Sequence, residues 1–215
     1  MPECDSILFS TAYLPNIQYF SKILSHKSIF IEAQENYQKQ SYRNRAVILG
    51  ANGPLDLVIP VIKPEGNRTK TCNILIDYTL PWQQTHWKSI ISAYKNSPFF
   101  DIFEQELQPL YQKKEKFLLD LNLRMLDKLL AIVGVQKAYS LTEIYFVQTK
   151  DYFYDCRNSI HPKKRLQQPD KQFEPIPYFQ VFSEKFGFIP NLSFIDLLFN
   201  EGPQAIYICR KCYKN

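Results

Sequence analysis

The chain begins with two short apolar runs separated by one helical pattern. Residues 6–12 and 28–32 are typical of short buried strands, and between them apolar side chains recur at spacings of three and four over Ile17–Leu24. A strand, a helix and a strand within about 27 residues form a βαβ unit, whose strands run parallel and are joined by a right-handed crossover. We therefore predict a parallel strand pair at the start of the fold.

A β-hairpin is predicted immediately after this unit. Two strand-like segments, residues 41–49 and 55–61, flank a turn that contains Asn52-Gly53, the strongest short-range hairpin signal. Pro60 has no backbone N–H to donate, so it places the second strand at an edge or ends it. One more strand is expected at residues 72–77, after a polar loop.

The middle of the chain has a helical pattern. One helix is expected to begin after Pro81 and to end at Ser97-Pro98. A second follows from Phe99, and a third ends before Gly134, a residue suited to the left-handed position after a helix. The apolar stripes of these helices are core candidates. Strand-like alternation returns over residues 139–148.

The last third of the chain combines a long loop with a short helix. Residues 150–178 are rich in proline, lysine and glutamine, and loops of this length are commonly either lids over a site or disordered. Ser193 is a suitable N-cap for a helix over Phe194–Asn200, with Asp196 in its first turn. Ala205–Cys209 is expected to form a last strand.

Together these elements predict an α/β fold, in which a small mixed sheet opens with a parallel βαβ unit, adds a β-hairpin and packs against a mainly helical second half. A chain of 215 residues, 45% of them apolar, suits one compact domain that buries about 70% of its unfolded surface. We therefore expect a single domain over residues 1–215. Its expected parts are a mainly β part with one helix over 1–80, a helical part over 81–135, a loop and candidate lid over 150–178, and a C-terminal helix and strand over 179–215.

Charge and composition argue against several classes of protein. The net charge of +5 is modest and the basic clusters are short, which suits an anionic small molecule better than a nucleic acid. The glycines form neither of the two common phosphate-binding motifs. The longest apolar run, Leu129–Val135, has seven residues against the roughly 20 of a membrane span, and no basic signal region opens the chain. A cytoplasmic location without a membrane span is therefore expected.

The cysteines indicate neither a disulfide framework nor a metal site. Their number, five, is odd and their positions are scattered. Cys209-x-x-Cys212 has the spacing of half a zinc site, but a second pair is missing and the three histidines lie far away in the sequence. No metal ligand is therefore assigned, and no motif identifies a cofactor.

The densest polar stretch, residues 35–45, follows the carboxyl end of the second predicted strand. Ligands bind at that edge of open α/β sheets, where irregular loops supply polar groups. Arg43 and Arg45 are two positions apart, so on a strand both would point to one face and could hold a phosphate or carboxylate. The alternative is a solvent-facing side of the hairpin, with each arginine paired to a glutamate or aspartate.

Three further positions are candidates for chemistry. The turn Tyr13–Asn16 leads into a helix whose first N–H groups could hold an anion, or it is a simple proline-initiated helix start. His86, between two tryptophans, could act as an acid or base, or could be hydrogen-bonded in the core. Asp196 is costly to bury without a partner, so we expect it to pair with one of the two arginines or to complete a capping box.

The order of these motifs is similar to that of a known family. The motifs are Tyr13-Leu-Pro15, Tyr19-Phe20, Tyr37-Gln-Lys39, Ser41-Tyr-Arg-Asn-Arg45, Ala93-Tyr94, Ser97-Pro-Phe-Phe100, Leu192-Ser193 and Asp196-Leu-Leu-Phe-Asn200. With this set the chain resembles the WbqC-like family over about residues 7 to 203. Many members carry a His-Gln pair shortly before the Leu-Pro turn, where this sequence has Ser10-Thr11-Ala12.

The resemblance implies a bacterial protein, because some members are found among genes for surface-polysaccharide (O-antigen) synthesis. It also implies a transferase that attaches an aminoacyl (glycyl) or acyl group to a nucleotide-linked amino sugar. The expected catalytic residues are Glu32, His86 and Asp196, with Glu32 or His86 as the base that deprotonates the acceptor amine. The expected substrate-binding residues are Tyr13, Pro15, Tyr37, Gln38, Ser41, Arg43, Asn44, Arg45 and Asn200. The expected partners are an anionic substrate such as a nucleotide sugar and other enzymes of polysaccharide synthesis, but no nucleic acid.

Three alternatives stay open at this point. A non-catalytic binding or scaffold protein of a polysaccharide assembly system would carry its aromatic side chains on an exposed patch. A nucleotidylyltransferase of the HIGH type opens with a similar strand, turn and helix, but its hallmark histidines are absent here. Nucleic-acid binding would require a strongly salt-dependent affinity for DNA or RNA.

Overall fold

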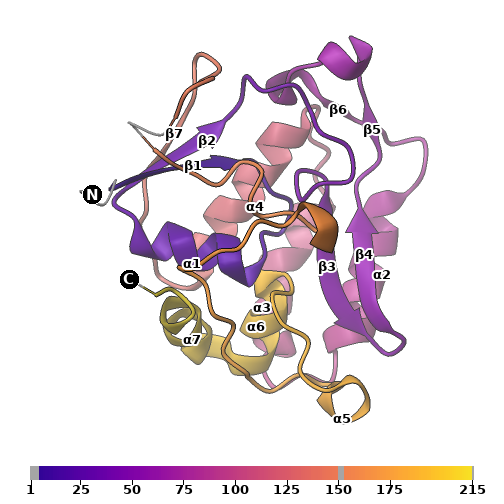
Figure 1. The fold of residues 1–215 in the computed structure, drawn as a ribbon. Helices are drawn as coiled ribbons and strands as arrows, with labels where there is room; N and C mark the ends of the chain where they lie inside the picture. The colour runs from indigo at the N-terminus through magenta and orange to yellow at the C-terminus, as the bar shows by residue number, and fades with distance from the viewer. Residues whose placement is uncertain (1–4, 150–152, 215) are drawn as a thin grey trace.

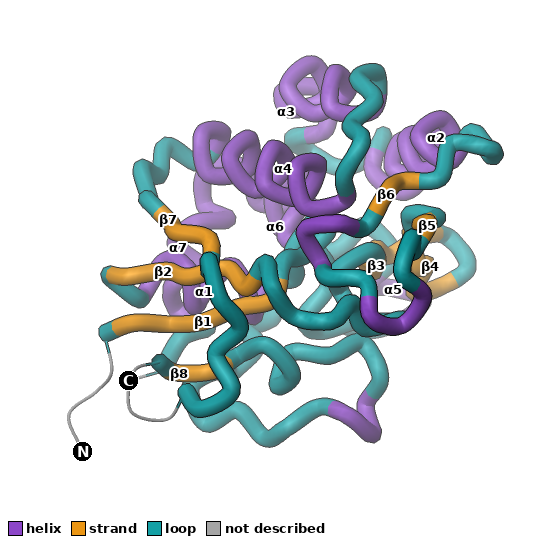
Figure 2. The backbone as a smooth tube through the Cα atoms, turned by 90° about the horizontal axis from the view of Figure 1, so that it is seen from above, coloured by secondary structure: helices purple, strands orange, loops and turns teal. Residues whose placement is uncertain are grey.

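The computed structural model describes residues 5–149 and 153–214 of the chain (Figure 1). Its strands are β1 (Ser6–Ser10), β2 (Ser28–Glu32), β3 (Arg45–Gly50), β4 (Gly53–Val58), β5 (Val61–Ile62), β6 (Leu75–Ile76), β7 (Tyr139–Leu141) and β8 (Tyr154–Asp155). Its α-helices are α1 (Ile17–Ser25), α2 (Trp82–Tyr94), α3 (Phe100–Leu107), α4 (Leu118–Ile132), α5 (Ser183–Phe186), α6 (Phe194–Glu201) and α7 (Ala205–Lys211). The sheet that holds β1 and β2 lies toward one side and the β3–β4 hairpin toward the other in both Figure 1 and Figure 2.

A four-stranded parallel sheet forms the first layer of the fold. Its strand order is β7-β2-β1-β8, and every neighbouring pair is parallel. The central pair runs in register from Ser6 opposite Ser28 to Ser10 opposite Glu32. The predicted βαβ unit, with α1 as its crossover, is therefore confirmed, and so is the mixed α/β class.

Helix α1 begins at a polar cap and packs against the C-terminal helices. The Asn16 side chain accepts a hydrogen bond from the Tyr19 backbone N–H at 2.9 Å, which is the usual N-cap contact. On the buried face, the Phe20 ring stacks on Phe194 of α6 with centroids 3.8 Å apart. The Cys209 thiol of α7 reaches the Ile17 carbonyl at 3.7 Å. The crossover helix thus lies between the parallel sheet and the end of the chain.

The predicted hairpin is present, but its first strand starts later than expected. Strands β3 and β4 pair antiparallel from Arg45 opposite Val58 to Gly50 opposite Gly53. Gly53 has a φ of +106°, which only glycine adopts without strain. Of the strand predicted over 72–77, only Leu75–Ile76 pairs, with β5, because Thr71–Asn73 form a 3₁₀ turn. That prediction was too long.

The helical second half is confirmed, with one error near the end of the chain. Helices α2, α3 and α4 follow one another, and Gly134 takes a φ of +68° directly after the C-cap of α4. The predicted strand over Ala205–Cys209 is wrong, because this segment forms most of α7. Alternation would place Ala205, Tyr207 and Cys209 on one face, yet Ala205 and Cys209 are fully buried while Tyr207 is 56% exposed. That pattern belongs to a helix.

The long loop predicted over 150–178 is docked onto the first helix where the structure describes it. Lys22 of α1 has a fully buried side chain and pairs with Asp170 of the loop at 3.0 Å. The same ammonium lies 4.7 Å from the centroid of the Tyr154 ring. Since a buried charge is costly to leave unpaired, this ion pair holds the loop against the body of the protein.

Candidate functional site

The carboxyl edge of the parallel sheet gathers polar groups from three strands. Ser10 ends β1 and Glu32 ends β2, directly opposite each other in the register. Cys156 and Arg157 follow β8, whose last residue pairs with Leu8 of β1. Because the carboxyl ends of parallel strands meet at one edge, these residues are neighbours although they are far apart in the sequence.

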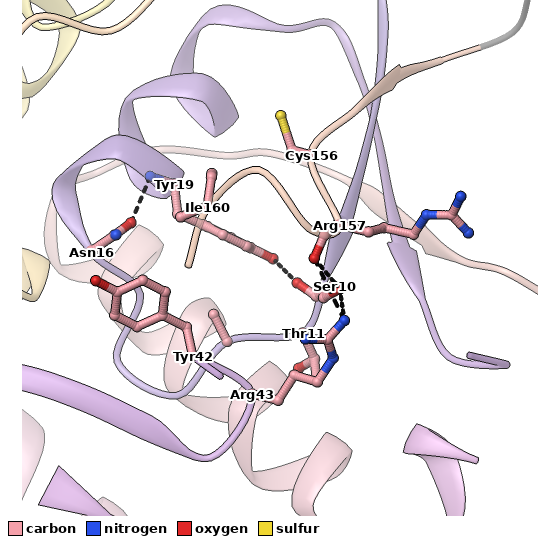
Figure 3. Close-up of a pocket in the computed structure, with 10 residues that line it drawn as sticks. Ser10, Thr11, Asn16, Tyr19, Tyr42, Arg43, Cys156, Arg157 and Ile160 are labelled. Atoms are coloured by element: carbon pink, nitrogen blue, oxygen red, sulfur yellow. Dashed lines mark hydrogen bonds between the residues drawn. The ribbon is translucent and has the colours of Figure 1, made fainter. Parts of the chain in front are cut away.

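A small pocket opens at this edge (Figure 3). Its walls come from the end of β1, the start of α1, the loop before β3 and the segment after β8. They consist of Ser10, Thr11, Ala12, Asn16, Tyr19, Tyr42, Arg43, Cys156, Arg157 and Ile160. The free interior measures about 10 Å³, roughly the space that one water molecule needs. One compact group of a ligand therefore fits, and a whole sugar ring does not.

Arg43 brings a guanidinium to the pocket wall, and Glu35 neutralises it. The guanidinium donates from Nε to Glu35 Oε1 at 2.7 Å and from Nη2 to Oε2 at 2.6 Å. Nη2 also donates to Ser10 Oγ at 2.5 Å, and Ser10 in turn donates to the Arg157 carbonyl at 3.0 Å. Both members of the ion pair are nearly buried, with side chains 3% and 5% exposed. Arg43 is thus a fixed part of the wall.

Arg157 joins three segments of the sheet edge. Its Nη1 donates to Glu32 Oε2 at 3.1 Å, and Nε and Nη2 hold the Asp155 carboxylate. Figure 3 shows its backbone carbonyl directed toward Ser10 and Arg43 while its guanidinium points away from them. The remaining oxygen of Glu32 accepts from Thr142 Oγ1 at 2.6 Å. Glu32, predicted as a base, therefore lies at the site with both carboxylate oxygens bonded.

The start of α1 does not offer the free N–H groups considered from the sequence. The Ile17 N–H donates to the Leu192 carbonyl at 3.0 Å, and the Gln18 N–H donates to Asn191 Oδ1 at 2.9 Å. The Tyr19 N–H is bonded to Asn16, as described above. An anion at this helix end would have to displace protein partners, so the alternative of a simple helix start holds.

Asn16 caps α1 and faces the Tyr42 hydroxyl in the pocket wall. Its Oδ1 caps α1, so its amide orientation is set and Nδ2 carries the N–H donors. Nδ2 is buried, and the Tyr42 hydroxyl is the group it faces. The amide lies near enough to the Tyr42 hydroxyl to lower the pKa of that phenol, although burial raises it overall.

The sulfur and imidazole groups near the pocket are uncharged at neutral pH. Burial raises the pKa of the Cys156 thiol to about 12, so the thiolate that a nucleophile needs is not formed there. Burial lowers the pKa of His161, and the neighbouring charges of Arg43 and Lys163 lower it further. His161 Nδ1 accepts the Lys163 backbone N–H at 3.0 Å. His161 is therefore a neutral group beside the pocket.

His86 and Tyr13 lie outside this pocket and bond each other. The Tyr13 hydroxyl is 2.9 Å from His86 Nδ1 and 3.0 Å from the Tyr111 hydroxyl. Burial lowers the pKa of His86 to about 4. These contacts match the alternative in which His86 is a hydrogen-bonded core residue. Pro15, in the turn that begins at Tyr13, accepts at its carbonyl from the Phe194 N–H at 2.8 Å.

Asp196 and Asn200 form a second buried cluster, away from the arginines. Asp196 accepts from the Tyr178 hydroxyl at 2.7 Å and from the Tyr94 hydroxyl at 2.8 Å. The expected pairing with Arg43 or Arg45 was wrong, because tyrosine hydroxyls satisfy the carboxylate. Burial raises the pKa of Asp196 to about 6, although these hydrogen bonds oppose the change. Asn200 donates to the Asp196 carbonyl at 2.8 Å.

The other residues predicted to bind substrate stand around the pocket rather than in it. We expected Arg43 and Arg45 on one face of a strand, and this was wrong, because Arg43 lies before β3. Arg45 is the first residue of β3 and pairs with Asp56 at 2.8 Å. The remaining four make hydrogen bonds to residues that do not line the pocket: the Tyr37 N–H donates to the Thr69 carbonyl, Gln38 to Asn158, Ser41 to the Gln38 carbonyl and Asn44 to the Ile59 carbonyl.

Several residues of the pocket were not predicted as site residues. Ser10 and Thr11 were noticed only as a departure from the family pattern, and Cys156 and Arg157 lie in the segment described only as a loop. Their common signal is position at the end of a parallel strand. That signal was available for Ser10 but not for Cys156, because a two-residue strand such as β8 has no periodicity.

Neither a metal cluster nor a membrane span is found in the part of the chain that the structure describes. No three His, Cys, Asp or Glu side chains within residues 5–149 and 153–214 are grouped as metal ligands would be. None of the helices described is long and apolar enough to cross a bilayer.

Comparison with known proteins identifies a family but not an activity. The chain is 25% identical to the uncharacterized protein Rv1507c of Mycobacterium tuberculosis (strain ATCC 25618 / H37Rv), over 223 aligned residues that cover 93% of this chain and 95% of that protein. No solved structure matches the chain. The model of the WbqC-like protein family matches residues 11–169, well over half of the chain and nearly all of the pocket wall. The protein with this pocket at the edge of its parallel sheet is therefore a member of the WbqC-like family.

Proposed function

We propose that the protein is a transferase of bacterial surface-polysaccharide synthesis that attaches an aminoacyl (glycyl) or acyl group to a nucleotide-linked amino sugar. The observation that carries the proposal is the pocket at the carboxyl edge of the parallel sheet, where open α/β proteins place their ligands. Its polar wall and small interior suit one polar group of a larger substrate.

The reaction needs a base, and Glu32 is the predicted base that lies at this edge. It stands opposite Ser10, a residue of the pocket wall. The acceptor amine would attack the carbonyl carbon of the activated group, the leaving group would depart with its electron pair, and the amine proton would pass to Glu32. For this either the Arg157 contact to one oxygen, or the Thr142 and Gln34 contacts to the other, would have to give way.

The diphosphate of the nucleotide would remain outside the pocket in this proposal. Arg43 and Arg45 are already paired with Glu35 and Asp56, whereas Lys163 places positive charge near His161, beside the pocket. Lys163 also contacts Gln40 of the loop before β3. The residues after β8 would then act as a lid, because they form one wall of a pocket too small for a sugar.

The test is a transfer assay followed by mass spectrometry of the sugar. Purified protein is incubated with nucleotide-linked amino sugars and either glycine with ATP or an acyl thioester. A mass increase of one glycyl or acyl residue is expected, and Glu32→Gln should lower its rate roughly 10²–10⁴-fold. Tyr42→Phe, at the pocket wall, should reduce transfer, while Tyr139→Phe, a half-buried tyrosine on β7, serves as the matched control. An unmodified sugar in every combination would contradict the proposal.

The scaffold alternative has one observation in its favour. Both tryptophans are buried, so they form no aromatic patch, but Ile144 and Val147 are 65% and 81% exposed in the loop after β7. Exposed apolar groups in one loop are a common partner contact. If the scaffold role is correct, Ile144→Ser with Val147→Ser should abolish a complex with polysaccharide-synthesis enzymes, and Glu32→Gln should leave that complex intact.

A further inference from the structure

The loop after β7 holds two apolar side chains out of the molecule. Ile144 and Val147 are largely exposed, although the residue between them is fixed to the body of the protein. The Phe146 carbonyl accepts from Arg157 Nη1 at 2.9 Å, and the Phe146 ring packs edge-on against Phe153 with centroids 5.2 Å apart. The loop is therefore attached to the sheet edge on one side and presents an apolar tip to solvent on the other.

Basic loops lie on the same side of the molecule as this tip. The loop after β2 and the chain between β5 and β6 are joined, because Asn36 and Lys70 form a β-bridge and the Tyr37 N–H donates to the Thr69 carbonyl at 3.0 Å. Since β2 and β7 are parallel neighbours, the loops that follow them leave the same edge of the sheet. In Figure 1 the loop after β7 and the chain between β5 and β6 both project from the top of the molecule.

The lysines of these loops have no carboxylate to neutralise them among the described residues. Lys70 donates to the Gln34 side-chain oxygen at 3.2 Å, and Lys63 donates to the Asn67 side-chain oxygen at 2.9 Å, both uncharged acceptors. Desolvation and the nearby ammonium of Lys39 lower the pKa of Lys63. The basic residues of these loops and of the segment after β8 are Lys39, Lys63, Arg68, Lys70, Lys163 and Arg165, and the exposed acids of the same loops are Glu65 and Glu143. This side of the molecule therefore has a surplus of positive charge.

An apolar tip beside unpaired lysines matches the surface of an anionic bilayer. Apolar side chains enter the region of the lipid headgroups, and each lysine or arginine near anionic headgroups strengthens binding roughly fivefold. The apolar area of two side chains is far below the roughly 800 Å² per partner of a stable protein interface. A bilayer requires no matched shape, so the combination favours a lipid surface over a protein partner.

We propose that the loop after β7 and the basic loops beside it dock the protein on an anionic phospholipid surface. Ile144 and Val147 would enter the headgroup region, and Lys39 and Lys70 would lie against the lipid phosphates. The inference goes beyond the proposed function and does not depend on it, because it concerns the place where the protein works. The pocket opens at the same sheet edge, so a docked molecule would hold it near the lipid surface.

The experiment measures co-sedimentation of the purified protein with vesicles, and the charged side chains are tested first. The wild type should bind vesicles of phosphatidylglycerol and phosphatidylcholine far more tightly than vesicles of phosphatidylcholine alone, and high salt should weaken binding because it screens the lysines. Lys39→Gln with Lys70→Gln should lower the partition coefficient roughly 30-fold. The matched control is Lys88→Gln with Lys95→Gln, two exposed lysines of which Lys88 borders the tip of the β3–β4 hairpin, and it should leave binding unchanged.

The apolar tip has a variant and a control of its own. Ile144→Ser with Val147→Ser should lower the partition coefficient about 10-fold or more, whereas Ile102→Ser, at an exposed isoleucine of α3, should leave it unchanged. Val147→Trp should report insertion directly, because indole emission shifts to shorter wavelength when the ring leaves water. Thermal unfolding should show that all these variants remain folded.

The outcomes distinguish this inference from the proposed transfer. The inference is overturned if the wild type does not bind anionic vesicles, if it binds neutral vesicles equally well, or if the control variants lose as much binding as the test variants. It is also wrong if vesicles do not bind while Ile144→Ser with Val147→Ser abolishes a protein complex, because the surface then belongs to a protein partner. Transfer without vesicle binding would leave the transferase proposal standing, and vesicle binding without transfer would support the docking surface alone.

Discussion

His86 should make the stability of the protein depend on pH, and the direction follows from its burial. Burial lowers the pKa of its imidazole from 6.5 to about 4, although a hydrogen bond to the Val58 backbone opposes the change. Below pH 6.5 the unfolded chain takes up a proton at this position that the folded protein does not. The free energy of unfolding therefore falls as the pH falls from 6.5 to 4.

The size of this effect follows from the two pKa values. They are 6.5 and about 4, and a pKa difference of one corresponds to about 1.4 kcal/mol. Protonation of the unfolded chain at His86 should thus remove about 3 kcal/mol of stability by pH 4.

Asp196 should make the free energy of unfolding change with pH in the opposite direction, over nearly the same pH range. Burial raises the pKa of its carboxyl group from 3.8 to about 6, so the folded protein keeps a proton that the unfolded chain releases. Its stabilising contribution is complete below pH 3.8 and is lost as the pH rises to about 6. It also amounts to about 3 kcal/mol. In the wild type the pH dependences contributed by His86 and Asp196 therefore largely cancel between pH 4 and 6.

Single variants should reveal the pH dependence of stability that each residue contributes. His86→Gln removes the titrating group, while its amide can still accept from Tyr13 and donate to the Val58 carbonyl. Relative to the wild type, it should gain about 3 kcal/mol between pH 6.5 and pH 4, and Asp196→Asn should lose a similar amount between pH 6 and pH 4. Urea unfolding, followed by the fluorescence of the two buried tryptophans, measures both. If the stability difference between His86→Gln and the wild type does not vary with pH, the conclusion that His86 is buried and neutral in the folded protein is refuted.

Three further changes have expected effects on stability or exchange. Arg43→Met leaves its carboxylate partner buried and unpaired, so urea unfolding should show a loss of about 3–5 kcal/mol. Lys22→Met removes the buried anchor of the loop after β8, so hydrogen exchange should increase at amides of that loop and stay unchanged in the β3–β4 hairpin. Gly202→Ala would place a Cβ against the ring of Phe99 at a φ of +54°, and thermal unfolding should show a loss of roughly 2–5 kcal/mol.

The parts of the fold that could be predicted from the sequence are those with local signals. The parallel unit of β1, α1 and β2 has a helical period between two apolar runs, and the hairpin has Asn52-Gly53 at its turn. Helix α7 has only seven residues, too few for a period of 3.6 to be distinguished from alternation. Its assignment depends on packing against α1, which no local pattern contains.

The candidate site was less predictable because it depends on contacts across the chain. Arg43 was considered as an anion ligand or as the partner of an acid, and the choice depended on Glu35, eight positions away, turning toward it. Arg157 and Ser10 are 147 positions apart and meet only because β8 pairs with β1. No spacing in the sequence indicates that a two-residue strand will bind there.

The late arrival of β8 has a consequence for how the protein is made. A ribosome releases the β1–α1–β2 unit more than 100 residues before β8, which at about 5–20 residues per second is a delay on the order of ten seconds. During that time the open edge of β1 is available to chaperones and to neighbouring nascent chains. The pocket is thus completed near the end of translation, and truncated chains should lack it entirely. Expression at lower temperature or with a chaperone that shields strand edges should therefore raise the yield of folded protein.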